Sequence, residues 1–203
     1  MAKKVVAIVG SYRKGGVIDT AIDEVLAGAK AQGAETEKIY LIDEKLLFCT
    51  NCRACTQAPG TGRGKCVLDD GLEAILTKLD QADALVLGSP VNYYNITAIS
   101  RQFLERLVGS AYWPWGKAVA PKPRSKALTK PAVLITSAAM PGFLHAIMTG
   151  APKGLKLMAG CLGAKPVKTL SFGMLNMKPD TNLSKRQAAK ARAAAQDLLN
   201  AQI

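Results

Sequence analysis

Apolar residues gather in short runs along the chain, and between the runs apolar and polar positions alternate with a helical period. Short apolar runs are typical of strands buried on both faces, and the run at 84–88 predicts such a strand. A coarse reading of the whole chain predicts strands near 4–9, 35–42, 84–88, 132–137 and 165–172. The helical pattern predicts helices near 17–32, 71–81, 97–110, 143–162 and 184–200. Regular alternation of strand and helix indicates an α/β protein, doubly wound around a five-stranded parallel sheet of order 2-1-3-4-5.

A length of 203 residues suits one domain covering 1–203. Two segments stand outside the alternating pattern: a cysteine-rich loop at 48–70 and a basic insertion rich in Trp and Pro at 111–130. The sequence holds no apolar run of membrane-spanning length and no signal-like start, since Met1-Ala2-Lys3-Lys4 leads straight into a strand. We therefore expect a cytoplasmic protein that does not enter a membrane.

The loop after the third predicted strand combines aromatic and amide side chains. It leaves the carboxyl end of a central strand, where open α/β sheets bind their ligands. Pro90 constrains the turn, and Asn92 and Asn95 bring paired hydrogen-bond donors and acceptors. Tyr93 and Tyr94 between them add flat surfaces. This mixture favours a planar ring with hydrogen-bonding edges over a sugar or a metal.

A glycine- and serine-rich turn, GSYRKGG at 10–16, joins the first predicted strand to its helix. A strand, such a turn and a helix N-terminus together form a common phosphate-binding geometry. Ser11 can add a hydroxyl, and Arg13 and Lys14 add positive charge. The turn matches neither a Walker P-loop nor a GxGxxG dinucleotide fingerprint. A phosphate site and a ring site on neighbouring strands together predict a mononucleotide ligand.

The segments GSYRKGG and SPVNYYNITAISRQFLER resemble the flavin loops of the flavodoxin-like NAD(P)H-dependent FMN reductases, and most of all those of the iron–sulfur flavoprotein branch. The likeness extends from the first strand to Gly163. It implies that the FMN phosphate is surrounded by Ser11, Arg13, Gly16, Val17 and Ile18. It implies that the isoalloxazine ring and ribityl chain are lined by Pro90, Val91, Asn92, Tyr93, Tyr94 and Asn95. A third loop, 136–142, would meet the far edge of the ring through Ser137 and Ala138.

Two positions depart from the pattern of this family. Val17 and Ile18 stand where relatives often carry Asn and Thr, so that only their backbone amides could serve the phosphate. Tyr94 stands where a glycine is frequent, which would change how open the ring face is. Neither the residues nor the resemblance singles out a catalytic residue.

Four of the five cysteines fall in one segment, at Cys49, Cys52, Cys55 and Cys66. In a cytosolic protein such clustering favours metal or redox chemistry over disulfides. A C-x2-C-x2-C triplet lets three thiolates converge, as in [4Fe–4S] ferredoxins, which have a more distant fourth ligand. We expect a [4Fe–4S] cluster, with tetrahedral zinc and metal-free thiols as alternatives. The ten-residue gap before Cys66 is longer than in most iron–sulfur flavoproteins, and Cys161 is expected to be a core residue.

The formal net charge is +12, and the stretch from Arg106 to Pro179 holds eleven Lys and Arg but no Asp or Glu. This pattern fits a solvated basic surface, or a field that attracts an anionic nicotinamide or an acidic redox protein. Nucleic acid is disfavoured because no known nucleic-acid module occurs. Trp113 and Trp115 resemble an exposed apolar patch, so we expect the Tyr112–Lys130 arm to cover a neighbouring subunit's flavin in a homodimer or homotetramer.

Together these features predict an FMN-binding oxidoreductase that takes electrons from NAD(P)H or a ferredoxin-like protein and passes them to an acceptor through the cluster. Three alternatives remain: a cluster-free NAD(P)H-dependent FMN or quinone reductase, a non-catalytic electron carrier of flavodoxin type, and a regulatory or interaction protein on the same scaffold. Flavodoxin-type carriers are typically acidic, unlike this chain. His145 is the only histidine, expected partly buried in a helix, so a Ser-His-Asp triad is disfavoured.

Overall fold

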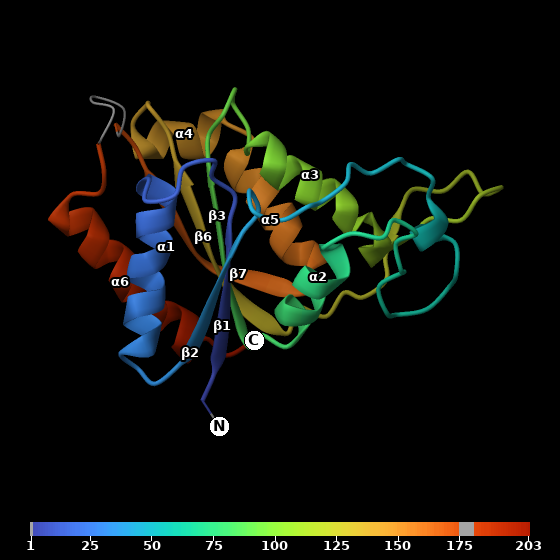
Figure 1. The fold of residues 1–203 in the computed structure, drawn as a ribbon, viewed down its shortest axis with the longest axis horizontal. Coiled ribbons are helices and arrows are strands. Elements are labelled where there is room, and N and C mark those ends of the chain that lie inside the picture. Colours follow the sequence, from blue (N-terminus) through green and yellow to red (C-terminus); the bar gives the residue numbers. More distant parts are fainter. Residues whose placement is uncertain (1, 175–180) are drawn as a thin grey trace.

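Five parallel strands form the central sheet of the computed structural model, which describes residues 2–174 and 181–203 (Figure 1). The strands of this sheet are β1 (Lys4–Val9), β2 (Glu35–Tyr40), β3 (Ala84–Pro90), β6 (Lys130–Ser137) and β7 (Ala164–Phe172). Their order, β2-β1-β3-β6-β7, confirms the predicted 2-1-3-4-5 arrangement, because β6 and β7 are the fourth and fifth strands of this sheet. The central strands β1 and β3 are almost wholly buried, as expected with helices on both faces.

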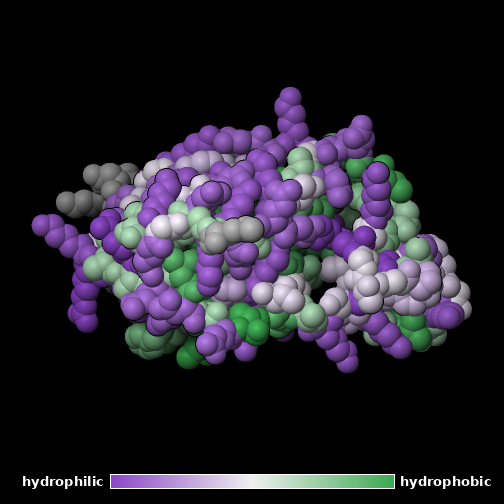
Figure 2. Space-filling model, turned by 90° about the horizontal axis from the view of Figure 1, so that it is seen from below, coloured by the Kyte–Doolittle hydropathy of each residue, from purple (hydrophilic) through white to green (hydrophobic). Residues whose placement is uncertain are grey.

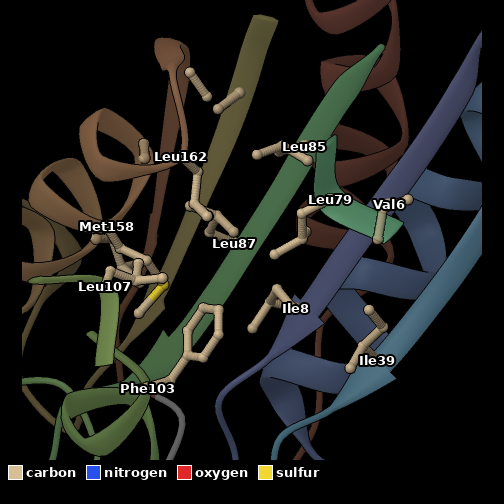
Figure 3. Close-up of a cluster of buried hydrophobic side chains, with 14 of the residues drawn as sticks. Val6, Ile8, Ile39, Leu79, Leu85, Leu87, Phe103, Leu107, Met158 and Leu162 are labelled. Carbon is tan, nitrogen blue, oxygen red and sulfur yellow. The ribbon is translucent and has the colours of Figure 1, made fainter. Parts of the chain in front are cut away.

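Helices cover both faces of the sheet and bury a separate core on each (Figure 1). Helices α1 (Val17–Lys30) and α6 (Lys185–Asn200) pack on one face, and α2 (Leu72–Asp80), α3 (Ala98–Arg106) and α5 (Ala151–Cys161) pack on the other. Alternate residues of β1 serve the two cores, because successive strand side chains point to opposite faces. Val6 and Ile8 belong to the same core as Phe103 of α3 and Met158 of α5, which Figure 3 shows.

The predicted helix at 143–162 is two helices, α4 (Gly142–Met148) and α5, with a break at Thr149 and Gly150. At the break the backbone N–H of Gly150 donates to the carbonyl of Tyr94, at 2.7 Å. A Cβ on Gly150 would lie 2.9 Å from Nδ2 of Asn95, so the chain approaches this loop only with glycine there. The break is therefore held against the loop that follows β3, a tertiary contact that the local pattern does not encode.

A side lobe, made of the cysteine-rich loop 48–70 and the insertion 111–130, projects from one end of the molecule (Figure 1). Strands β4 (Ala111–Tyr112) and β5 (Lys122–Pro123) pair antiparallel within the insertion, while the loop contains a 3₁₀ turn at Ala54–Thr56. A second 3₁₀ turn, Leu107–Ser110, continues α3 into the lobe where a longer helix was predicted. In the part of the chain described, no helix combines the length and apolar character needed to cross a membrane.

Candidate functional site

The loops that follow β1, β3 and β6 meet at the carboxyl edge of the sheet. The backbone N–H of Gly10 donates to the carbonyl of Gly88 at 2.7 Å, and Thr97 Oγ1 donates to the carbonyl of Gly10 at 2.6 Å. A Cβ on Gly10 would lie only 1.9 Å from Oγ of Ser100, which explains the glycine. The first glycine-rich loop is thus held directly against the start of α3.

The first turn of α1 leaves backbone N–H groups available to an anion. Gly16 is its N-cap and makes no side-chain cap, and helix N-termini of this kind bind phosphate. Ile18 is 1% exposed, so its side chain belongs to the core and only its amide can serve a ligand, as predicted. Ser11 is also buried, and its Oγ accepts from the N–H of Arg13 at 3.1 Å, which shapes the loop. This arrangement fits the FMN phosphate.

A buried carboxylate that the sequence analysis missed supports the same loop. Asp19 Oδ2 accepts from the N–H of Gly15 at 2.6 Å, while Oδ1 accepts from Lys38 Nζ at 2.7 Å and from Tyr40 Oη at 3.0 Å. Gly15 has φ of 71°, a left-handed conformation that favours glycine. Burial raises the pKa of Asp19, but the bonds from Lys38, Gly15 and Tyr40 outweigh it and hold the pKa below its usual value. The signal that could have revealed it is an acidic residue in the first turn of the helix.

The aromatic loop after β3 is a two-residue turn. Asn92 and Asn95 exchange backbone hydrogen bonds at 2.8 and 3.0 Å, and Tyr93 and Tyr94 between them have φ of 47° and 64°. Positive φ at both central positions is typical of a type I′ turn, which normally selects Gly or Asn. Non-glycine residues held in this strained conformation are enriched at functional sites. Tyr93 is fully exposed and Tyr94 is 64% exposed, so both rings face solvent. Their contact with a ligand remains a prediction.

The third predicted loop follows β6. The N–H of Val91 donates to the carbonyl of Ser137 at 2.7 Å, which joins the ends of β3 and β6, and Ser137 is 7% exposed. Behind it His145 is fully buried, more than the sequence indicated, and its Nε2 lies 2.8 Å from Thr136 Oγ1. Burial lowers the pKa of His145, which keeps the ring neutral near pH 7.

All four clustered cysteines line one pocket in the side lobe, as their spacing predicted: Cys49, Cys52, Cys55 and Cys66. Asn51 and Arg53 have φ of 54° and 57°, and these left-handed turns fold the triplet back on itself. Burial raises the pKa of Cys55, and the other three thiols raise it further. Hydrogen bonds from the backbone of Ala54 and from Thr50 lower the pKa of Cys52.

The donor set of this pocket fits a thiolate-bound centre, but its present size does not. The free volume is about 20 Å³, roughly the space of one water molecule. Among residues 2–174 and 181–203, no three His, Cys, Asp or Glu side chains stand in positions that could hold a metal ion. All five cysteines are free thiols. A bound cluster would therefore require these side chains to rearrange.

Arg106 joins the cysteine pocket to the core, and nothing in the sequence pattern signalled its role. Its side chain is fully buried, and Nη1 lies 2.5 Å from Oδ2 of Asp70, whose side chain is 3% exposed. Nη2 donates to Cys66 Sγ at 3.4 Å, and Nη1 donates to the carbonyl of Leu47 at 2.6 Å. Nε has no partner among the described residues. The guanidinium thus connects the Asp70 carboxylate to the Cys66 thiol.

The insertion packs against the cysteine-rich loop of its own chain. The guanidinium carbon of Arg53 lies 3.5 Å from the ring centroid of Trp113 and 3.8 Å from that of Trp115. Trp113 also pairs its backbone with Thr56, whose carbonyl accepts from the Trp113 N–H at 2.9 Å. Trp113 is therefore already covered, whereas Trp115 stays 60% exposed. The reach of this arm to a neighbouring subunit remains a prediction, and the acid-free basic stretch ends at 175–180, outside the described residues.

Stability should fall as the pH drops below about 4. The pKa values of Asp19 and Asp70 are held below their usual 3.8 in the folded protein, although burial opposes the shift at each. Such groups stabilise the fold above the unfolded pKa, and their contribution is lost as pH falls through the folded pKa. Urea unfolding at a series of pH values measures this slope. The Asp19→Asn variant should show a shallower slope below pH 4, and an unchanged slope would contradict the assignment.

Comparison with known proteins places these features in one family. Residues 3–173 match the family model of NADPH-dependent FMN reductase. An iron–sulfur flavoprotein of Archaeoglobus fulgidus is 32% identical over 111 residues, 55% of this chain and 48% of that protein. An iron–sulfur flavoprotein of Methanocaldococcus jannaschii is 35% identical over 103 residues, 51% of each chain. The matched region thus spans about half the length of these relatives.

Solved structures support the fold. An NAD(P)H:quinone oxidoreductase from Methanothermobacter marburgensis superposes with a TM-score of 0.71 at 16% identity, covering 98% of this chain and all of the other. An azoreductase from Bacillus anthracis gives 0.65 at 18% identity, covering 98% and 99%. A flavodoxin from the Archaea gives 0.54 at 12% identity, covering 97% and 95%. At these identities the likeness establishes a flavodoxin-like fold.

Proposed function

This chain belongs to the NADPH-dependent FMN reductase family, and from that premise we propose that it is an FMN-dependent oxidoreductase that takes electrons from NAD(P)H and passes them to an acceptor. The observation that carries the proposal is the convergence of three loops at one edge of the sheet. An uncapped helix N-terminus, the Asn92–Asn95 turn and Ser137 are tied together there by the Gly10–Gly88 and Val91–Ser137 hydrogen bonds.

Different residues of the site bind the FMN phosphate, hold the loop in shape and orient the flavin ring. The first-turn amides of α1 and the charge of Arg13 bind the phosphate, because a helix N-terminus and a guanidinium both favour an anion. Asp19, neutralised by Lys38, keeps Gly15 in its left-handed conformation and so keeps the loop in shape. The turn after β3 and Ser137 flank the ring. Bound FMN would supply the redox chemistry, and the protein orients and tunes it.

The four clustered cysteines form a second candidate centre in the side lobe. We infer that Cys49, Cys52, Cys55 and Cys66 hold a [4Fe–4S] cluster, which would supply one-electron transfer. Support comes from the four thiols that line one pocket, from buried Arg106 beside Cys66, and from the relatives named iron–sulfur flavoprotein. Since the pocket has room for about one water molecule as it stands, a cluster-free NAD(P)H-dependent reductase is the second candidate. A cytoplasmic location and homo-oligomeric assembly stay predictions.

Anaerobic mixing with NADPH separates an enzyme from an electron carrier. When NADPH or NADH is added to the FMN-loaded protein, the absorbance of the oxidised flavin should disappear as the flavin is reduced. A non-catalytic carrier would be reduced by dithionite while both nicotinamides leave its spectrum unchanged, and that result would contradict the proposal. The faster of the two nicotinamides identifies the donor.

Removing the charge of Arg13 should weaken FMN binding. A charge-assisted hydrogen bond is worth roughly 1.5–3 kcal/mol, so Arg13→Ala should raise the FMN dissociation constant at least tenfold. Lys30→Ala is a matched control, because it removes the same charge from the opposite end of α1. Fluorescence titration of the two apoproteins with FMN gives the comparison. Equal dissociation constants in the two variants would rule out a specific contact from Arg13.

A further inference from the structure

A second cavity, separate from the three loops and from the cysteine pocket, opens between the side lobe and α5. It has a volume of about 840 Å³, within the range of small-molecule sites. In Figure 2 the surface is hollowed where the lobe, at the right of the view, meets the main body. Its walls come from the insertion at 121–130, from α5, and from Arg63 in the loop before Cys66.

The cavity lies at the opposite edge of the sheet from the proposed flavin site. Lys130, the first residue of β6, lines the cavity, whereas Ser137, the last residue of the same strand, belongs to the flavin loops. Eight residues of strand separate the two edges by about 23 Å at 3.3 Å per residue. A ligand in this cavity therefore cannot be the flavin bound at the three loops or a molecule stacked on that flavin.

The charge of the cavity wall is strongly one-sided. Five cationic side chains line it: Arg63, Arg124, Lys126, Lys130 and Lys156. The wall has one carboxylate, Asp80, and Arg63 already pairs with it at 2.5 Å. Among the described residues, the hydrogen bonds of Arg124 and Lys130 go to backbone carbonyls, and neither side chain forms an ion pair with a carboxylate.

Lys126 in the insertion and Lys156 on α5 both line the cavity. Both are exposed, and among the described residues neither forms an ion pair with a carboxylate. Apolar side chains lie between these charges. Leu128 and Leu157 are 39% and 54% exposed, and Leu162 is buried at the base. Basic groups around an apolar surface match a ligand with an anionic head and an apolar body.

We propose that this cavity binds an organic anion of that kind, a carboxylate or phosphate attached to an apolar chain or ring. Charge complementarity selects the head group, since the wall holds four more positive than negative side chains, five against one. The leucines give the apolar body a surface to bury. Arg124 also donates to the carbonyl of Cys55 at 3.0 Å, so the cavity borders the cysteine pocket without sharing its thiols.

Calorimetric titration of the flavin-loaded protein tests this site with four probes: decanoate, decyl phosphate, decanol and inorganic phosphate. Decanoate, decyl phosphate or both should bind with one equivalent per chain, and the better of the two identifies the head group. Decanol and inorganic phosphate should each bind at least tenfold more weakly, because each lacks half of the recognised chemistry. If decanol or inorganic phosphate binds as tightly, or if neither anionic amphiphile binds, the proposal fails.

Two double variants separate the cavity from the general basic surface. Lys126→Gln/Lys156→Gln removes two lining charges and should weaken binding about tenfold. Lys122→Gln/Lys153→Gln also removes two exposed lysines, one from the insertion and one from α5, but neither lysine lines the cavity. This variant should change the affinity by less than twofold. An equal loss in both would show a nonspecific field and overturn the site. Release of the bound probe by added free FMN would likewise overturn it.

Discussion

Replacing Arg106 with Leu should lower the free energy of unfolding by about 3–5 kcal/mol, the usual cost of breaking a buried ion pair by removing one partner. The variant leaves the Asp70 carboxylate, whose side chain is 3% exposed, without the guanidinium that lies 2.5 Å away. It also frees the carbonyl of Leu47, which accepts from the same side chain. Urea unfolding at pH 7 measures the loss.

Arg101→Leu is the matched control, because it removes the same charge from the same helix. Arg101 pairs with Glu105 at 3.0 Å, but both side chains are about half exposed, so the cost should stay below about 0.5 kcal/mol. A double variant, Arg106→Leu/Asp70→Asn, should recover part of the lost stability, because it removes the unpaired buried charge while an amide oxygen remains to accept from the backbone N–H groups of Leu47 and Leu72. A loss below about 1 kcal/mol in Arg106→Leu alone would mean that this pair does not stabilise the fold.

Replacing Cys52 and Cys55 with Ser should reduce iron and sulfide to background while FMN content stays unchanged. The cysteines lie in the side lobe, whereas the flavin loops follow β1, β3 and β6, so the two sites have no residues in common. Reduction of the flavin by NADPH should persist, and transfer to a one-electron acceptor should be lost. Anaerobic iron and sulfide analysis, followed by acceptor assays, measures both effects.

The control for these variants is Cys161→Ser, which changes the one cysteine outside the cysteine pocket. Cys161 lies at the end of α5, half-buried, and packs against the core. Its replacement should leave iron, sulfide and electron transfer as in the unmodified protein. If the unmodified anaerobic protein carries no iron or sulfide, the chain is a cluster-free reductase and its thiols serve another purpose.

The sheet could be predicted from the sequence because its signal is local. Strands β1, β3 and β6 contain short apolar runs, and the alternation of strands with amphipathic helices favours a doubly wound sheet, whose order the structure then confirms. The cysteine pocket was also predictable, since three of its ligand candidates lie within seven residues and need only a tight turn. The same holds for the phosphate turn, where Gly10 and the N-terminus of α1 are adjacent in the chain.

The features that could not be predicted from the sequence depend on contacts between residues that are far apart in the chain. Arg106 meets Asp70 across 36 positions, and Arg53 lies between Trp113 and Trp115 across about 60, so neither contact leaves a periodic trace. The helix break at Gly150 likewise arises from Asn95, not from its own neighbours. Two tyrosines at positive φ were unexpected because the turn type normally selects Gly or Asn.

Flavin, iron and sulfide analysis of anaerobically purified protein tests the central claim most directly. We expect one FMN per chain, together with four irons and four sulfides if the side lobe holds its cluster. If the protein contains FMN but no iron, the flavin site is supported and the chain is a cluster-free reductase. Protein that contains no flavin and does not bind added FMN would contradict the account and favour an interaction protein on the same scaffold.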